Sequence, residues 1–232
     1  MCGIAGEIRF DGNFADAGAV AKMLDVLAPR GPDGTGVVAR GPVAFGHRRL
    51  KIIDLSENSA QPMTDSDLGL TITFNGCIYN YPELRAELES EGYTFFSHGD
   101  TEVILKSFHK WGEACVERFH GMFAFAIYDR IENELFIVRD RFGVKPVYFA
   151  VTADHLAFAS EAKALFASGL VPAAIRPEGL IEYCTFQNTL GSRTIWQQVE
   201  LLPAGHFLRF KPGTNTDPVI KRYFDGFPDS AE

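Results

Sequence analysis

Cys2 is the residue of this chain whose position suggests chemistry most directly. It follows Met1 in the sequence Met-Cys-Gly-Ile-Ala-Gly. Cells trim an initiator methionine when the next side chain is small, so we expect the mature chain to begin with a free Cys2. A terminal cysteine carries a thiol of pKa about 8.5 and an α-amine of pKa about 7.7–8.0. One residue then supplies both a nucleophile and the base that takes its proton. The alternative is a small buried residue in a first strand, which position alone favours.

Three further features have the residue types that a thiol attacking an amide would need. Asn75 and Gly76 offer a side-chain amide and an approachable backbone N–H, the donors of an oxyanion hole, although Asn-Gly is also the commonest turn dipeptide. An arginine fork suits a substrate carboxylate, and the pattern does not choose between Arg48 and Arg49. Asp100 offers an acceptor for an ammonium group, with a helix N-cap as its structural alternative.

The composition is that of an ordinary soluble globular chain. The 232 residues are 46% hydrophobic and 22% charged, enough for one large domain with a sizeable core. The net charge of −8 argues against a nucleic-acid partner, which would need a basic surface. No apolar run approaches the roughly 20 residues of a membrane helix and no leader precedes the globular sequence, so we expect a cytoplasmic protein that does not contact a membrane.

The cysteines point to the same compartment. They are widely spaced, with no Cys-x-x-Cys pair and no accompanying ligand cluster: Cys2, Cys77, Cys115 and Cys184. We therefore expect reduced thiols and neither a disulfide framework nor a metal site.

The hydrophobic pattern predicts an α+β chain. Strands are expected over 4–10, 35–39, 43–53, 70–75, 122–128, 135–138, 147–151, 156–159 and 206–210, and helices over 16–27, 82–92, 101–111, 161–168 and 177–183. The third strand and the strand ending at Asn75 would position the arginines and the Asn-Gly pair. Strands separated by helices in pairs favour layered antiparallel sheets over strict βαβ alternation.

The motifs taken together resemble the glutaminase domain of asparagine synthetases, which are class II glutamine amidotransferases. The resemblance is carried by residues 1–6 (MCGIAG), 30–33 (RGPD), 47–50 (HRRL), 74–80 (FNGCIYN), 100–102 (DTE), 121–126 (GMFAFA), 139–146 (RDRFGVKP), 159–161 (ASE) and 202–205 (LPAG). It implies a four-layer αββα sandwich of the N-terminal-nucleophile hydrolase type over residues 1–210, with Cys2 at the end of a central strand. Residues 211–232 would be a linker toward a synthetase domain that is absent from this chain.

The same resemblance implies glutamine as the substrate. Cys2 would be the nucleophile with its own amine as base, and Asn75 and Gly76 would form the oxyanion hole. The implied glutamine-binding set is Arg49 for the α-carboxylate, Asp100 for the α-amino group, and Leu50, Ile52, Ile53, Asn75, Gly76 and Cys77 along the pocket. This domain would need no cofactor and no metal, because ATP and magnesium would serve only the synthetase domain. A homodimer is left open.

One departure from the family pattern leaves the ammonia acceptor open. Cys77 stands where most asparagine synthetases have a glutamate, and Asn-Gly-Cys-Ile-Tyr-Asn is similar to the amidotransferase that acts on N-acetylglutaminylglutamine. The acceptor could thus be aspartate or a peptide carboxylate. The pyrophosphate-gripping Ser-Gly-Gly-x-Asp-Ser loop of the synthetase half does not occur here. A self-processing amidase of the same fold and a catalytically silent docking module are the competing functions.

Overall fold

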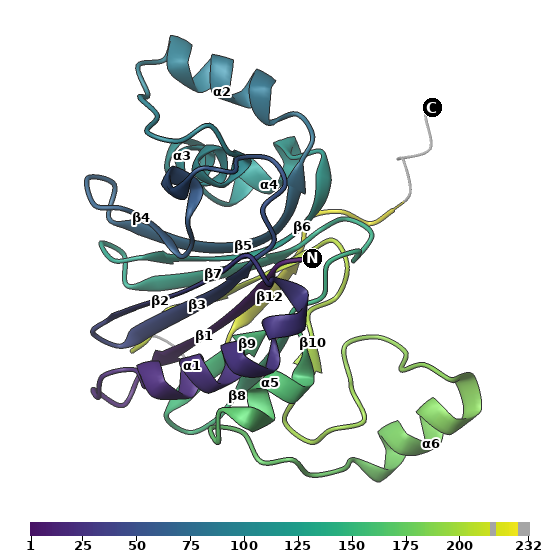
Figure 1. Ribbon diagram of the computed structural model, residues 1–232. Coiled ribbons are helices and arrows are strands. Elements are labelled where there is room, and N and C mark those ends of the chain that lie inside the picture. The colour runs from purple at the N-terminus through teal and green to yellow at the C-terminus, as the bar shows by residue number, and fades with distance from the viewer. Residues whose placement is uncertain (214–216, 227–232) are drawn as a thin grey trace.

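Two antiparallel sheets packed face to face form the centre of the computed structural model, which describes residues 1–213 and 217–226 (Figure 1). In spatial order the first sheet consists of β10 (Glu200–Leu201), β8 (Tyr148–Val151), β9 (His155–Ala159), β1 (Gly3–Arg9), β3 (Val43–Arg49) and β2 (Gly34–Arg40). The second consists of β12 (Val219–Arg222), β11 (His206–Phe210), β7 (Glu134–Arg139), β6 (Gly121–Asp129), β5 (Leu70–Ile78) and β4 (Met63–Asp65). Every named strand pair is antiparallel.

Helices cover the outer face of each sheet (Figure 1). Two lie on the first sheet, α1 (Ala17–Val26) and α5 (Ala162–Ala167), and three lie on the second, α2 (Tyr81–Ser90), α3 (Asp100–Trp111) and α4 (Cys115–Arg118). A sixth helix, α6 (Pro177–Phe186), stands on an arm at the side of the first sheet. The expected N-cap of the first helix is confirmed, since the Asp16 carboxylate accepts the N–H groups of Gly18 and Ala19.

Three buried apolar layers hold these elements together. One lies between the sheets and includes Phe45 and Phe158, whose rings meet edge to face at 5.4 Å. A second joins the second sheet to its helices and is rich in phenylalanine, with Phe119, Phe123 and Phe125 in mutual contact. The third joins the first sheet to α1 and α5. The chain is therefore the four-layer αββα sandwich that the sequence predicts.

The structure corrects the expected strands near the pocket. The strand predicted over 43–53 ends at Arg49, and the strand predicted to stop at Asn75 continues through Gly76 to Ile78, where it still pairs with β6. The short strands β4, β10 and β12 were not expected at all.

The end of the chain also differs from the expected linker over 211–232. Residues 219–222 form β12, which pairs with β11, and the Tyr223 hydroxyl donates to the Arg139 carbonyl at 2.8 Å. This part belongs to the packed domain, while residues 214–216 and 227–232 of the predicted linker lie outside the described residues.

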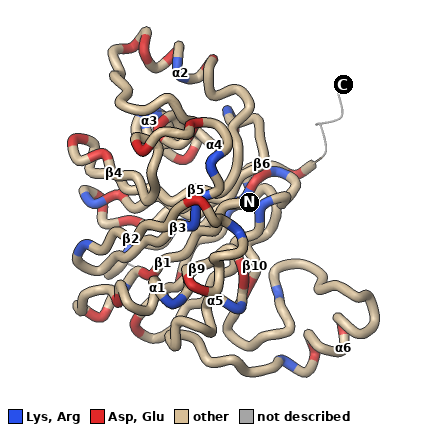
Figure 2. The backbone as a smooth tube through the Cα atoms, in the orientation of Figure 1, with Lys and Arg blue, Asp and Glu red and all other residues tan. Residues whose placement is uncertain are grey.

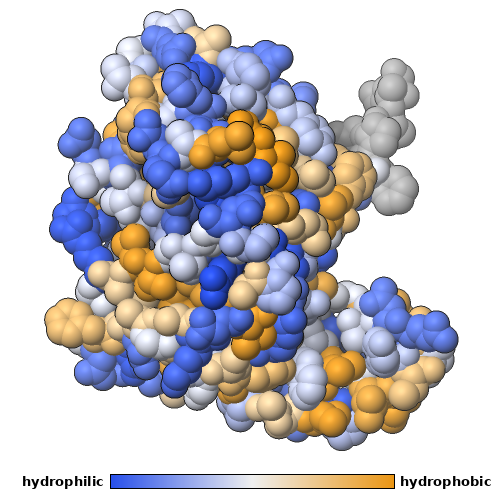
Figure 3. Space-filling model, viewed as in Figure 1, coloured by the Kyte–Doolittle hydropathy of each residue, from blue (hydrophilic) through white to orange (hydrophobic). Residues whose placement is uncertain are grey.

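The surface mixes charges of both signs. Lysine and arginine alternate with aspartate and glutamate over the helices and sheet edges (Figure 2). Apolar side chains gather on the α6 arm, where Ile181, Phe186 and Leu190 are exposed (Figure 3). Within residues 1–213 and 217–226, no helix has the length and apolar character needed to cross a membrane. All four cysteines carry free thiols.

Candidate active site

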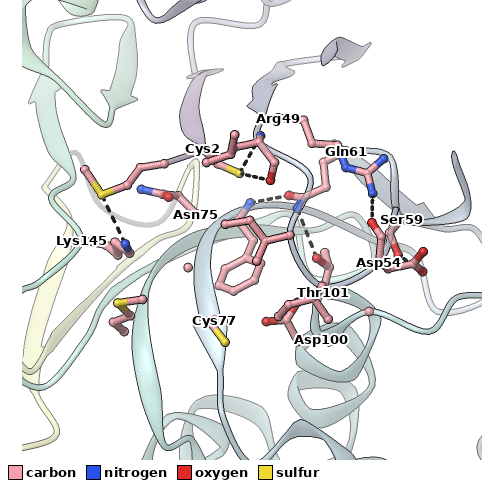
Figure 4. Close-up of a pocket in the computed structure, with 18 residues that line it drawn as sticks. Cys2, Arg49, Asp54, Ser59, Gln61, Asn75, Cys77, Asp100, Thr101 and Lys145 are labelled. Carbon is pink, nitrogen blue, oxygen red and sulfur yellow. Dashed lines mark hydrogen bonds between the residues drawn. The ribbon is translucent and has the colours of Figure 1, made fainter. Parts of the chain in front are cut away.

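The candidate site is a pocket of about 310 Å³ where the ends of β1, β3 and β5 meet the start of α3 (Figure 4). All nine residues that the sequence analysis proposed line it: Cys2, Arg49, Leu50, Ile52, Ile53, Asn75, Gly76, Cys77 and Asp100. Residues from four elements far apart in the sequence thus converge on one cavity, although their individual roles stay predictions.

Cys2 lies immediately before β1 and beside the end of β3. Its Sγ atom accepts the N–H of Leu50 at 3.3 Å and lies 3.7 Å from the Leu50 carbonyl oxygen. Burial raises the pKa of the Cys2 thiol, while the Leu50 N–H and the positive charges of the N-terminal amine and Arg49 lower it. Because β3 ends at Arg49, the Leu50 backbone is free to hold the thiol instead of pairing with a strand.

The Gly76 N–H points away from β6 toward the open edge of β5. Gly76 lies opposite Phe123 of β6. The Phe123 N–H donates to Asp140 Oδ2, and the Phe123 C=O accepts the Asp140 N–H at 2.8 Å. Gly76 and Phe123 are therefore a non-hydrogen-bonded pair, and the Gly76 groups face the other side of the strand. There β4 pairs only as far as Ile72, so no strand covers Gly76.

The neighbours of Gly76 on this open edge are both occupied. The Phe74 N–H donates to Gln61 Oε1 at 2.7 Å, and the Ile78 N–H donates to Asp100 Oδ2 at 3.0 Å. The Gly76 N–H between them lies in the pocket wall. Of these three donors, the Gly76 N–H is the one for which the described residues supply no acceptor, so it remains available to a bound molecule.

Asn75 supplies a second available donor. The residue is 1% exposed, and its Nδ2 atom has no hydrogen-bond partner among the described residues. A buried amide donor without a partner costs about 1–3 kcal/mol, so a retained one points to a ligand. In Figure 4 the Asn75 side chain lies on the same side of the pocket as Cys2.

The structure chooses between the two arginines. Arg49 lines the pocket, and its Nη1 and Nη2 atoms donate to the carbonyls of Ser56 and Asp54 at 2.9 and 2.6 Å. Arg48 lies on the opposite face of β3, where its Nε donates to the Leu24 carbonyl at 2.8 Å. The Arg49 fork is thus partly engaged in holding the loop after β3, and each terminal nitrogen keeps one further N–H.

Asp100 opens the first turn of α3 and is not its N-cap, which is Gly99. The carboxylate is 5% exposed, and burial raises its pKa to about 6, although the Ile78 N–H and the backbone N–H groups of the first turn lower it. A buried carboxylate whose charge is incompletely offset favours a cationic partner such as a substrate ammonium.

Cys77 lies on β5 and lines the pocket together with Asp100 and Lys145. Burial raises the pKa of its thiol, the Asp100 charge raises it further, and the Lys145 ammonium lowers it. The thiol therefore lies within electrostatic reach of both charged side chains.

Several lining residues were missed by the sequence analysis, among them Gln61, Thr101 and Lys145. Lys145 belongs to a motif that the resemblance included, but nothing local assigns its side chain to the pocket. Its Nζ lies 3.3 Å from Met1 Sδ. Thr101 likewise belongs to a motif of the resemblance without a local sign of its place, and Gln61 gave no signal, because its contacts with Phe74 and Thr101 exist only in the fold.

Comparison with known proteins identifies the family of the chain. A family model described as a glutamine amidotransferase domain matches residues 1–224. The chain belongs to this family. The amidotransferase domain is 40% identical to asparagine synthetase [glutamine-hydrolyzing] 3 of Bacillus subtilis (strain 168), over 97% of this chain and 37% of the relative. It is 37% identical to asparagine synthetase [glutamine-hydrolyzing] 1 of the same organism, over 97% of this chain and 35% of that relative. The domain thus spans little more than a third of these curated relatives.

The fold also matches solved structures. The glutamine phosphoribosylpyrophosphate amidotransferase from B. subtilis, in complex with ADP and GMP, superposes with a TM-score of 0.71 over 96% of this domain and 49% of that chain. At 19% identity this likeness establishes that the two proteins share a fold. The part of the domain that the structure describes contains no group of three or more His, Cys, Asp or Glu side chains placed to hold a metal ion.

Proposed function

We propose that this amidotransferase domain hydrolyses the side-chain amide of glutamine to glutamate and ammonia, with Cys2 as the nucleophile. The observation that carries the proposal is the pair of available donors beside the Cys2 thiol. The Asn75 Nδ2 is buried without a partner among the described residues, and the Gly76 N–H faces the open edge of β5. Two such donors are what a tetrahedral oxyanion requires.

The reaction follows from these positions. The Cys2 thiolate attacks the amide carbon, a C–S bond forms, and the carbonyl electron pair moves to the oxygen held by Asn75 and Gly76. The C–N bond then breaks as the nitrogen takes a proton, and ammonia leaves a thioester on Cys2. Water attacks the thioester, which releases glutamate and restores the thiol.

The proton would come from the terminal amine. Met1 is half-exposed and lines the pocket mouth. Hydrolysis of the Met1–Cys2 peptide bond would release Met1, turn the Cys2 backbone nitrogen into a free α-amine and clear space beside the thiol. An amine of pKa about 7.7–8.0 can take the thiol proton and return it to the leaving nitrogen.

The substrate's two charges match the two charged side chains of the pocket. Arg49 keeps free N–H groups for the α-carboxylate, and the buried Asp100 carboxylate suits the α-ammonium. Leu50, Ile52 and Ile53 border the space between Cys2 and these groups. This hydrolysis needs neither a cofactor nor a metal ion.

The fate of the ammonia is a further part of the proposal. The similar proteins are named as glutamine-hydrolysing asparagine synthetases, and this domain spans 35–37% of two of them. We therefore place this domain ahead of an ATP-dependent amide-forming synthetase domain in the full-length protein. A cytoplasmic setting is part of the same proposal and is supported by four free thiols, which are typical of a reducing compartment.

Glutamine-dependent ammonia release tests the proposal, with asparagine as the control amide. Cys2→Ala should abolish release, by on the order of 10⁶-fold, without lowering the melting temperature. Cys77→Ala, Cys115→Ala and Cys184→Ala should each retain substantial activity. Loss at Cys77 equal to the loss at Cys2 would contradict the assignment, and a fully active protein with an N-terminal extension would contradict the amine as base. A wild-type chain that releases no ammonia would favour the docking module.

A further inference from the structure

Both backbone polar groups of Phe74, the residue just before Asn75 and Gly76, are held by side chains. The Phe74 N–H donates to Gln61 Oε1 at 2.7 Å, and the Phe74 carbonyl oxygen lies 3.0 Å from His47 Nε2. Gln61 precedes β4, whereas His47 belongs to β3 of the other sheet. Beyond Ile72, where the pairing with β4 ends, side chains thus replace the missing strand.

The His47 contact requires one form of the imidazole. A carbonyl oxygen can only accept, so Nε2 must carry the hydrogen. Nδ1 then has a lone pair and no hydrogen, which agrees with its lack of a partner among the described residues. His47 is fully buried, and burial lowers its pKa to about 4, so this neutral donor persists at physiological pH.

Gln61 also reaches the other side of the pocket. Its Nε2 donates to Thr101 Oγ1 at 3.2 Å, and Thr101 follows Asp100 in the first turn of α3. The Gln61 backbone is itself fixed, since a Cβ on Gly36 would lie 2.3 Å from the Gln61 carbonyl oxygen. Figure 4 shows Gln61 between the β5 strand and the start of α3, with both contacts drawn.

From these contacts we infer that Gln61 and His47 are positioning residues for the oxyanion hole. They fix the peptide units on either side of Phe74, and with them the direction of the Asn75 side chain and of the Gly76 N–H that follows. Through its bond to Thr101, Gln61 also sets the distance between the Asn75-Gly76 pair and Asp100. The Gln61 side chain thus links the part of the pocket that would hold the reacting amide of glutamine to the part that would hold its ammonium group. The inference rests on the proposed function and adds residues to it.

The test compares three variants of the full chain by steady-state glutamine hydrolysis and thermal melting. Gln61→Met keeps a side chain of similar length but loses both hydrogen bonds. It should lower kcat about 10- to 100-fold, because misplacement of the reacting geometry by about 1 Å has effects of that size, and it should also raise KM several-fold because the Thr101 contact is lost with it. Thr101→Val breaks only the contact to α3 and should raise KM several-fold with kcat within about twofold. Thr101→Ser keeps the hydroxyl and should behave as wild type.

Backbone hydrogen exchange provides a readout that does not depend on catalysis. In Gln61→Met the Phe74 amide should exchange at least about tenfold faster, while the Asn75 amide, on the side of β5 that pairs with β6, should not. A Gln61→Met variant with wild-type kcat, or one with unchanged Phe74 exchange, would overturn the inference. An inactive wild-type chain would instead refute the proposed function, and the exchange data would still decide whether Gln61 fixes the strand.

Discussion

Two buried aspartates, Asp140 directly after β7 and Asp100 at the start of α3, show how a structural carboxylate differs from one proposed to bind substrate. Asp140 follows β7, is fully buried and does not line the pocket. Its two oxygens accept four backbone N–H groups, those of Phe123, Phe142, Val144 and Lys145, at 2.9–3.2 Å. It closes the turn after β7 and leaves nothing for a ligand.

Asp100 is nearly as buried but opens into the pocket. It ties α3 to β5 through the Ile78 N–H, yet burial still raises its pKa to about 6. Its charge is thus incompletely offset by the described groups around it. The two aspartates are buried to a similar degree but differ in how fully hydrogen-bond donors offset their charge. In this domain that difference, more than burial, distinguishes the structural carboxylate from the one proposed to bind substrate.

Removing the structural carboxylate should have the largest effect on folding. Asp140→Ala leaves buried N–H groups without an acceptor, each costing about 1–3 kcal/mol, so we expect a loss of about 3 kcal/mol or more. For a chain of this size that lowers the melting temperature by about 6–12 °C. Thermal unfolding followed by circular dichroism measures it.

An exposed carboxylate provides the matched control for this variant. Asp25→Ala breaks only the exposed contact with Arg48 and should change stability by at most about 1 kcal/mol. If Asp140→Ala had the melting temperature of the wild type, the hydrogen bonds of the turn would be dispensable, and the distinction between the two aspartates would fail.

The sequence predicted the layers of this fold, and the nine residues that it proposed line one pocket, but it misplaced the proposed oxyanion pair Asn75-Gly76 in its strand. Asn75-Gly76 has the composition of a turn, and the strand was expected to stop there. In the structure β5 continues because β6 pairs with it through Ile78, and a Cβ on Gly76 would lie 2.3 Å from the Met122 carbonyl oxygen. The glycine is required by a partner strand more than 40 residues away, which no local pattern reveals.

Other differences have the same physical origin. The choice between Arg48 and Arg49 depended on which face of β3 meets α1. The strands β4, β10 and β12 have two to four residues each and owe their existence to the strands that they pair with. Gln61 and His47 bond to the backbone of Phe74, and although His47 belongs to a motif of the resemblance, neither residue type indicates such a contact. The sequence predicted which elements occur and which residue types could form the site. It did not predict features that depend on contacts between residues far apart in the chain.

Exchanging the binding carboxylate should affect glutamine far more than folding. Asp100→Asn keeps an oxygen for the Ile78 N–H but loses the charge that attracts the substrate ammonium. We expect KM for glutamine to rise about 10- to 100-fold, as for a charged hydrogen bond worth about 1.5–3 kcal/mol. Steady-state kinetics measures it, and a normal KM in a variant that melts much lower would reduce Asp100 to a tie between α3 and β5.

The pH dependence of the same variant sharpens this test. The folded pKa of about 6 lies above the unfolded value of about 3.9, so the folded protein binds this proton more tightly. The ionised carboxylate therefore lowers stability at neutral pH, and that cost disappears as the pH falls from about 6 toward 4. Asp100→Asn should melt at or above wild type at pH 7.5, with the difference shrinking toward pH 4.5. In wild type, KM should rise as the pH falls below about 6.

The smallest effect is expected at Cys77, where this chain departs from the pattern of asparagine synthetases. The thiol lies within electrostatic reach of both Asp100 and Lys145. Cys77→Glu would add a second acceptor for the substrate ammonium. Repulsion from Asp100 would oppose the new carboxylate and attraction to the Lys145 ammonium would favour it, so we expect glutamine binding to tighten by only about 0–1 kcal/mol.

The measurement is KM for glutamine in wild type, Cys77→Glu and the uncharged control Cys77→Gln, each with and without Asp100→Asn. If the introduced carboxylate replaces part of the lost charge, Cys77→Glu should rescue the Asp100→Asn variant and Cys77→Gln should not. A collapse of activity in Cys77→Glu, with melting unchanged, would show instead that this pocket is shaped around the thiol and binds the ammonium differently from the relatives it resembles.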